Sequence, residues 1–149
     1  MSYQEKKVAV SLVGALVVFA IYLFYVSGMV QDGRLEGPDA GSLVGRSALW
    51  LIGGSIAVSI VLQILFVIIN GALTRERNFG VSDERDRLIE LKAMQIILIL
   101  FSIGFLASMA VLAAGWFAPP LILVMIVSVM MFANLVGDLV KFFIYRWWV

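Results

Sequence analysis

The sequence predicts an all-α integral membrane protein, a four-transmembrane-helix bundle that forms a single domain over residues 1–149. Composition is the first observation: 62% of the residues are hydrophobic, 14% are charged, and the mean hydropathy is +1.04. A soluble domain carries roughly 25% charged residues. The second observation is that the charges leave three long uncharged runs. The third is a Pro-Pro pair that divides the longest run.

The first two uncharged runs each predict one membrane helix. Residues 8–31 and 47–74 contain 24 and 28 residues without Asp, Glu, Lys or Arg, and about 20 helical residues cross the hydrocarbon core of a bilayer. We expect helices over residues 8–29 and 48–73. The first run exceeds the roughly 7–15 apolar residues of a secretory signal, so we expect it to be retained. Residues 32–46 between them are rich in glycine and predict an irregular surface loop.

The third uncharged run, residues 93–137, has 45 residues and is too long for one span. Pro119 and Pro120 lack backbone donors and drive the preceding residue out of helical geometry. This break predicts helices over residues 83–117 and 120–145. Ser82 is a suitable N-cap, and acidic residues follow it, where the helix dipole favours them. The third helix therefore begins before the apolar run, and its first turns are expected to extend into the cytoplasm.

The distribution of basic residues predicts the orientation in the membrane. Cytoplasmic loops of membrane proteins carry an excess of Lys and Arg. Nine of the eleven basic residues fall on the side of both termini: Lys6, Lys7, Arg75, Arg77, Arg85, Arg87, Lys92, Lys141 and Arg146. Only Arg34 and Arg46 fall on the opposite side. We expect a multi-pass protein of the cell (inner or plasma) membrane with both termini in the cytoplasm.

The chain lacks the residues that most enzymes and metal sites use. It contains no Cys and no His, which excludes thiol nucleophiles, disulfides, thiolate metal sites and imidazole acid–base catalysis. We therefore expect no enzyme activity, no catalytic residues, no cofactor and no metal site. A net charge of +1 argues against nucleic-acid binding.

The charged start of the third helix is a candidate docking element for a cytoplasmic or membrane protein partner. Its residues are Asp83, Glu84, Arg85, Asp86, Arg87, Glu90 and Lys92. Asp86 and Glu90 are one turn apart, a spacing that also suits a divalent cation. The adjacent basic residues neutralise these acids, which favours contact with a partner instead.

The same segment resembles a known group of proteins. Asp83-Glu84-Arg85-Asp86, Ile89 and Lys92-Ala93 are similar to the D-E-R-x-x-x-I-x-x-K-A signature of a loose group of uncharacterised small four-span membrane proteins from bacteria and archaea. The resemblance covers this motif and the four-helix layout. It implies a prokaryotic membrane location and no particular reaction.

Polar residues at membrane depth form a second candidate site. Ser55, Ser59 and Gln63 recur at four-residue spacing in the second helix, and Asn70 extends the same side. Such residues commonly pack helices together. The alternative is a water-filled path, built by several subunits.

Asp138 is the only acidic residue expected at membrane depth, near its cytoplasmic edge. Asn134 and Lys141 lie about one turn away on the same face. A structural ion pair with Lys141 is one interpretation. The other is a carboxylate that binds a proton or a cation and faces Gln63 or Asn70.

Small residues predict helix-packing faces at Ser11, Gly14 and Ala15, at Gly53 and Ala57, and at Gly104 and Ser108. Together, these patterns predict a non-enzymatic protein surrounded by membrane lipids. We expect it to be a homo-oligomer that acts as an assembly, regulatory or docking subunit. The alternative is an oligomeric ion or small-solute channel or transporter lined by the polar face of the second helix and Asp138.

Overall fold

The computed structural model describes residues 3–74 and 84–147, and within these ranges every regular element is an α-helix. The helices are α1 (Tyr3–Gln31), α2 (Ala40–Thr74), α3 (Glu84–Ala113) and α4 (Pro119–Trp147). All four are long and apolar enough to cross a membrane, which indicates a multi-pass membrane protein. The all-α prediction is confirmed, and the third uncharged run is divided into two helices at residues 114–118, just before the Pro-Pro pair.

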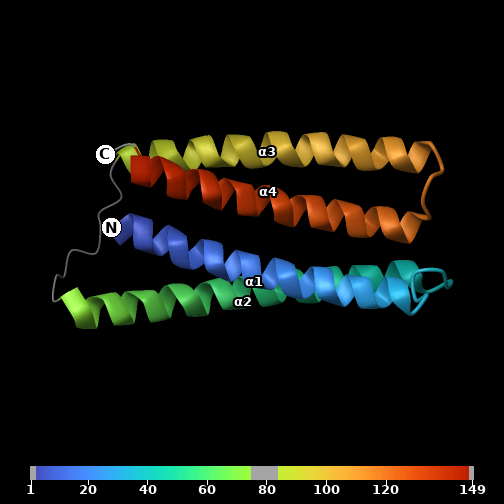
Figure 1. Cartoon of the computed structure of the whole chain (residues 1–149), viewed down its shortest axis with the longest axis horizontal. Helices are drawn as coiled ribbons and strands as arrows, with labels where there is room; N and C mark the ends of the chain where they lie inside the picture. The colour runs from blue at the N-terminus through green and yellow to red at the C-terminus, as the bar shows by residue number, and fades with distance from the viewer. Residues whose placement is uncertain (1–2, 75–83, 148–149) are drawn as a thin grey trace.

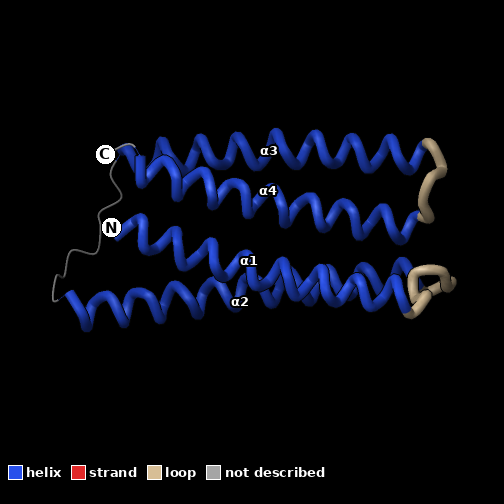
Figure 2. Tube along the Cα trace, in the orientation of Figure 1, coloured by secondary structure: helices blue, strands red, loops and turns tan. Residues whose placement is uncertain are grey.

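The helices are arranged as two antiparallel pairs joined through α4 (Figure 1). α1 packs against α2, α3 packs against α4, and α4 also packs against α1 and α2. Along the described helices, α3 has no comparable packing with α1 or α2. The first and last described residues lie at one end of the molecule, which we call the terminal end. Residues 32–39 and 114–118 form the connections at the other end, the loop end (Figure 2).

Glycines terminate α1 and α3 by the same motif. Gly33 and Gly115 both have φ of 67°, in the left-handed region that glycine adopts at little cost. In α3 the amide of Gly115 donates to the carbonyl of Leu112, and the amide of Trp116 donates to that of Val111. These two bonds form a Schellman motif, which satisfies carbonyls at the helix end. α3 therefore ends at Ala113, before the predicted residue 117, because Gly115 acts ahead of the prolines.

The start of α2 differs most from the sequence prediction. α2 begins at Ala40 instead of residue 48, so part of the predicted irregular loop is helical. The carbonyl of Asp39 accepts a hydrogen bond from the amide of Leu43 at 3.0 Å, and Asp is a favourable N-cap residue. Leu35 and Val44 are buried in a hydrophobic cluster with residues of α1 and α4. This burial holds the connection against the helices, although its sequence is rich in glycine.

Close packing of α3 on α4 depends on glycine. A Cβ atom added at Gly104 would collide with Val129, and one added at Gly137 would collide with Ile97. Ser108, one turn after Gly104, is completely buried. These contacts confirm the predicted packing role of Gly104 and Ser108.

The other two predicted small-residue faces differ from each other. Gly14 approaches Leu62 of α2 closely and so packs α1 against α2. Gly53 and Ala57 are exposed, and a Cβ at Gly53 would meet open space. Within the described part of this single chain, the second face therefore packs against no other helix.

Candidate functional site

Polar residues from three helices surround a cavity of about 270 Å³ between α1, α2 and α4. Its polar lining residues are Ser11 of α1, Ser55 and Ser59 of α2, and Asn134 and Asp138 of α4. Apolar and small residues complete the wall, including Gly14, Val18 and Met131. Four of the residues predicted to form a polar path, Ser55, Ser59, Asn134 and Asp138, therefore line one space.

Both carboxylate oxygens of Asp138 accept a hydrogen bond. The Ser11 hydroxyl of α1 donates to Oδ2 at 3.1 Å. The Lys141 ammonium group donates to Oδ1 at 3.4 Å and forms an ion pair with it. The side chains of Asp138 and Lys141 are 19% and 25% exposed, so the pair is partly sheltered. The structure thus contains the predicted Lys141 pair, together with a second donor, Ser11, which the sequence indicated only as a packing residue.

Asp138 shares its cavity with Ser55 and Ser59, whereas the sequence placed it opposite Gln63 or Asn70. The reason is the early start of α2. α2 and α4 both begin at the loop end, and Ser59 follows Ala40 by the same number of residues as Asp138 follows Pro119. Equal helical rise brings Ser59 and Asp138 to the same level.

A second, narrow cavity adjoins the first between α1 and α2. Its volume is about 20 Å³, and it shares Ser11, Gly14 and Ser59 with the larger cavity. Lys7 and Gln63 also line it. A water molecule needs roughly 10–15 Å³ of such volume, so the narrow cavity accommodates about one water. The polar lining thus continues toward the terminal end as far as Lys7, while Asn70 lines neither cavity.

The polar groups of the larger cavity present mainly oxygen acceptors. The Ser55 hydroxyl donates to the carbonyl of Ile52 at 2.8 Å, and the Asn134 amide nitrogen donates to that of Met130 at 2.9 Å. The Ser55 hydroxyl and one N–H of Asn134 are thus directed at backbone carbonyls, and the oxygen lone pairs of both side chains remain as acceptors. A carboxylate with hydroxyl and amide oxygens suits a proton or a small hard cation.

The start of α3 is anchored to α1 and α4. The Gln4 amide donates to Oδ2 of Asp86 at 3.0 Å, and the Tyr145 hydroxyl is hydrogen-bonded to the same carboxylate. Ile89 is fully buried in a cluster with Val8 and Tyr145. Asp86 therefore holds α3 against α1 and α4, and its partners Gln4 and Tyr145 carry no signal in the local sequence pattern.

The remaining candidate docking residues lie outward. Glu84, Arg85, Arg87, Glu90 and Lys92 are all exposed. Asp83 lies outside the described residues. Together the five exposed residues form a mixed-charge surface on the first turns of α3.

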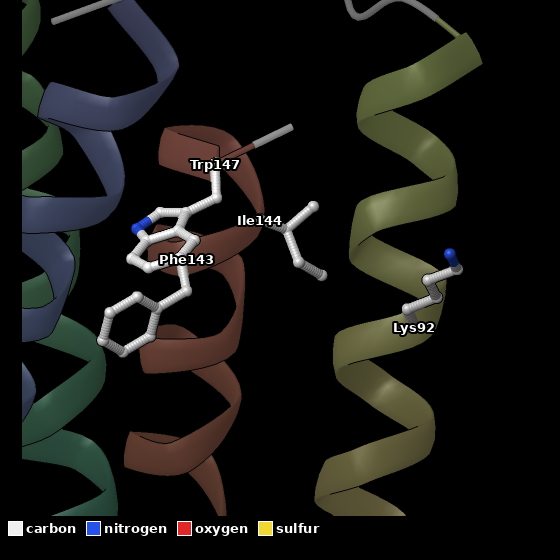
Figure 3. A pocket seen from close by; sticks show the side chains of 4 residues that line it. All are labelled: Lys92, Phe143, Ile144 and Trp147. Atoms are coloured by element: carbon white, nitrogen blue, oxygen red, sulfur yellow. The ribbon is translucent and has the colours of Figure 1, made fainter. Parts of the chain in front are cut away.

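Lys92 also borders a groove of about 500 Å³ between α3 and α4, with Phe143, Ile144 and Trp147. Figure 3 shows Ile144 on the side of α4 that faces α3, and the rings of Phe143 and Trp147 together on another side of α4. The groove is mainly apolar.

Within residues 3–74 and 84–147, no group of three or more Asp or Glu residues is placed to hold a metal ion. No protein-family model, curated protein or solved structure matches this chain.

Proposed function

We propose that the protein binds a proton or a small cation at Asp138 and carries it along the seam between α1 and α2, as a channel or transporter. The observation that supports this most directly is the convergence of Ser11, Ser55, Ser59, Asn134 and Asp138 on one cavity between apolar helices. Three helices of one chain supply its lining.

The cost of a charged carboxylate within a membrane supports a functional role. A charged residue at the centre of a membrane helix costs about 2.5–3.5 kcal/mol on insertion scales, and less near the edge. The Lys141 ion pair and the Ser11 hydrogen bond offset part of that cost. A purely structural pair would not require the adjoining polar cavity, with hydroxyl groups on two further helices and the Asn134 amide on α4 itself.

We place the protein in the cell membrane of a bacterium or archaeon, with both termini in the cytoplasm. The excess of Lys and Arg on the side of the termini supports the orientation. The motif around Asp83 and Lys92 supports the prokaryotic source. In this orientation the narrow cavity at Lys7 and Gln63 leads toward the cytoplasm.

Flux through reconstituted liposomes tests the proposal. Purified protein should release a proton or monovalent cation gradient, and Asp138→Asn should change the rate or the ion selectivity. Asn preserves the size of the side chain and an acceptor for Ser11. Glu36→Gln is the matched control, because Glu36 is exposed in the loop-end connection and lies outside the cavity. Liposomes that stay tight at high protein density would refute the proposal.

A second candidate function is a non-enzymatic assembly or docking subunit. It is supported by the exposed charges of Arg87 and Glu90 on a helix start that Asp86 and Ile89 fix in place. The exposed Gly53 face of α2 supports self-association into a homo-oligomer.

Two measurements test this second function. The mass of the intact detergent-solubilised complex should exceed that of one chain, through further copies or a partner polypeptide. The double substitution Arg85→Glu and Arg87→Glu should abolish partner capture and leave membrane insertion unchanged. A protein that is a single chain in detergent would count against this function. Partner capture by the double variant equal to that of the original protein would also count against it.

A further inference from the structure

A groove of about 600 Å³ lies between α1 and α2 at the loop end, and most of its lining differs in character from that of the polar cavity. We infer that this groove binds one anionic phospholipid, with an acyl chain between the two helices and the phosphate group at Arg46. The groove is lined mostly by apolar and aromatic side chains. Its volume lies in the range of about 300–1,000 Å³ that is typical of ligand sites.

The dimensions of the groove match one leaflet of a bilayer. Its α2 wall extends from Leu43 to Val58, and the part from Arg46 to Val58 is about 18 Å long at the rise of an α-helix. The hydrocarbon core is about 30 Å thick, so the groove spans roughly one half of it. Its inner end is at Val18, Ser55 and Val58, which also line the Asp138 cavity. An acyl chain that enters from the loop end would therefore stop where the polar cavity begins.

The charge at the mouth of the groove selects the head group. Arg46 is the charged residue among the lining residues, and no acidic side chain lines the groove. Among residues 3–74 and 84–147, no carboxylate pairs with Arg46. A guanidinium group binds phosphate oxygens through two parallel hydrogen bonds. Because nothing in the described chain neutralises Arg46, a lipid with a net negative head group fits better than a zwitterionic one.

Aromatic residues beside Arg46 are consistent with the depth of a head group. Trp50 lines the groove and is 83% exposed, and Tyr25 lines the opposite wall from α1. Trp and Tyr favour the boundary between head groups and acyl chains. Their rings thus lie where the glycerol backbone of a lipid would be when its phosphate contacts Arg46.

The test measures lipid enrichment next to the protein. Purified protein is reconstituted in phosphatidylcholine vesicles with a minority of brominated phosphatidylglycerol, and quenching of tryptophan fluorescence reports the bromolipid at Trp50. Trp50→Phe identifies the share of quenching that comes from the groove. Native mass spectrometry of the detergent-solubilised protein counts the retained lipids.

Two pairs of variants separate the groove from general effects. Arg46→Gln removes the proposed phosphate ligand, and Arg34→Gln removes the same charge from the loop-end connection, outside the groove. Gly54→Leu fills the groove, and Gly71→Leu adds the same side chain to an exposed position of α2 that does not line it. A Cβ at either glycine would meet open space, so neither substitution places its Cβ against another helix.

We expect Arg46→Gln to weaken phosphatidylglycerol binding about tenfold, as for loss of a hydrogen bond to a charged group. Gly54→Leu should abolish the Trp50-specific quenching, and both controls should behave as the original protein. Equal binding by Arg46→Gln and Arg34→Gln would overturn the inference, as would equal quenching in the two glycine variants. Equal enrichment of brominated phosphatidylcholine, or displacement of the lipid by inorganic phosphate alone, would also overturn it. None of these outcomes depends on ion flux. Unselective lipid binding would therefore refute this inference alone, and tight liposomes would refute the proposed function alone.

Discussion

The Ser11 hydroxyl of α1 donates a hydrogen bond of 3.1 Å to Oδ2 of Asp138 on α4. This bond joins two helices that are far apart in the sequence, and it fixes the carboxylate at the wall of the polar cavity. Helix-to-helix hydrogen bonds in membrane proteins contribute roughly 0.6–2 kcal/mol.

Ser11→Ala should therefore lower the free energy of unfolding by about 1 kcal/mol. The loss leaves Oδ2 of Asp138 without its donor from α1. Ser27→Ala is the control, because Ser27 is exposed and bonds only within its own helix, to the carbonyl of Phe24. Unfolding in mixed detergent micelles measures both. An equal effect of the two substitutions would show that the Ser11 bond contributes nothing specific.

Gly104→Ala should destabilise the α3–α4 pair by about 1–3 kcal/mol, the usual cost of overpacking. The added methyl group would collide with Val129, whose β-branched side chain has little rotamer freedom. Gly53→Ala should leave stability unchanged or raise it by up to about 1 kcal/mol, because alanine is the better helix former and the site is open. Thermal unfolding in detergent compares the two. A Gly104→Ala protein as stable as the original would contradict the close contact.

Asp86→Ala should loosen the start of α3 and lower stability by about 1–3 kcal/mol. The substitution removes the acceptor for Gln4 and the hydrogen-bond partner of Tyr145 at once. Hydrogen exchange should accelerate in the first turns of α3. Glu90→Ala removes the same charge one turn later at an exposed position and should have little effect. Similar exchange in both variants would mean that Asp86 does not anchor the helix.

The sequence was sufficient to predict the helices but less so their ends. Uncharged runs and the Pro-Pro pair identify four long apolar helices, because charge is costly in an apolar environment whatever the tertiary packing. The sequence predicts the start of α2 too late, since Gly41 and Gly45 favour a loop. Burial of Leu35 and Val44 against other helices decides that boundary, and such tertiary contacts are not visible in a local pattern.

That single boundary also changed the predicted site. With α2 starting at residue 48, Asp138 falls opposite Gln63 or Asn70, and with the start at Ala40 it falls opposite Ser59. The sequence predicts Ser55, Ser59 and Asn134 as residues of one polar site, and the structure brings them together around one cavity. Ser11 was missed as a partner of Asp138, because spacing along one helix does not show which residue of another helix faces it.

Labelling of single cysteines tests the membrane topology on which the whole account depends. The chain has no cysteine of its own, so Lys6→Cys, Glu36→Cys and Arg146→Cys each provide one reactive thiol at an exposed position. With a membrane-impermeant maleimide on intact cells, we expect Glu36→Cys to react and the other two to react only after the membrane is opened. Reaction of Lys6→Cys and Arg146→Cys from opposite sides would contradict a chain that crosses the membrane four times.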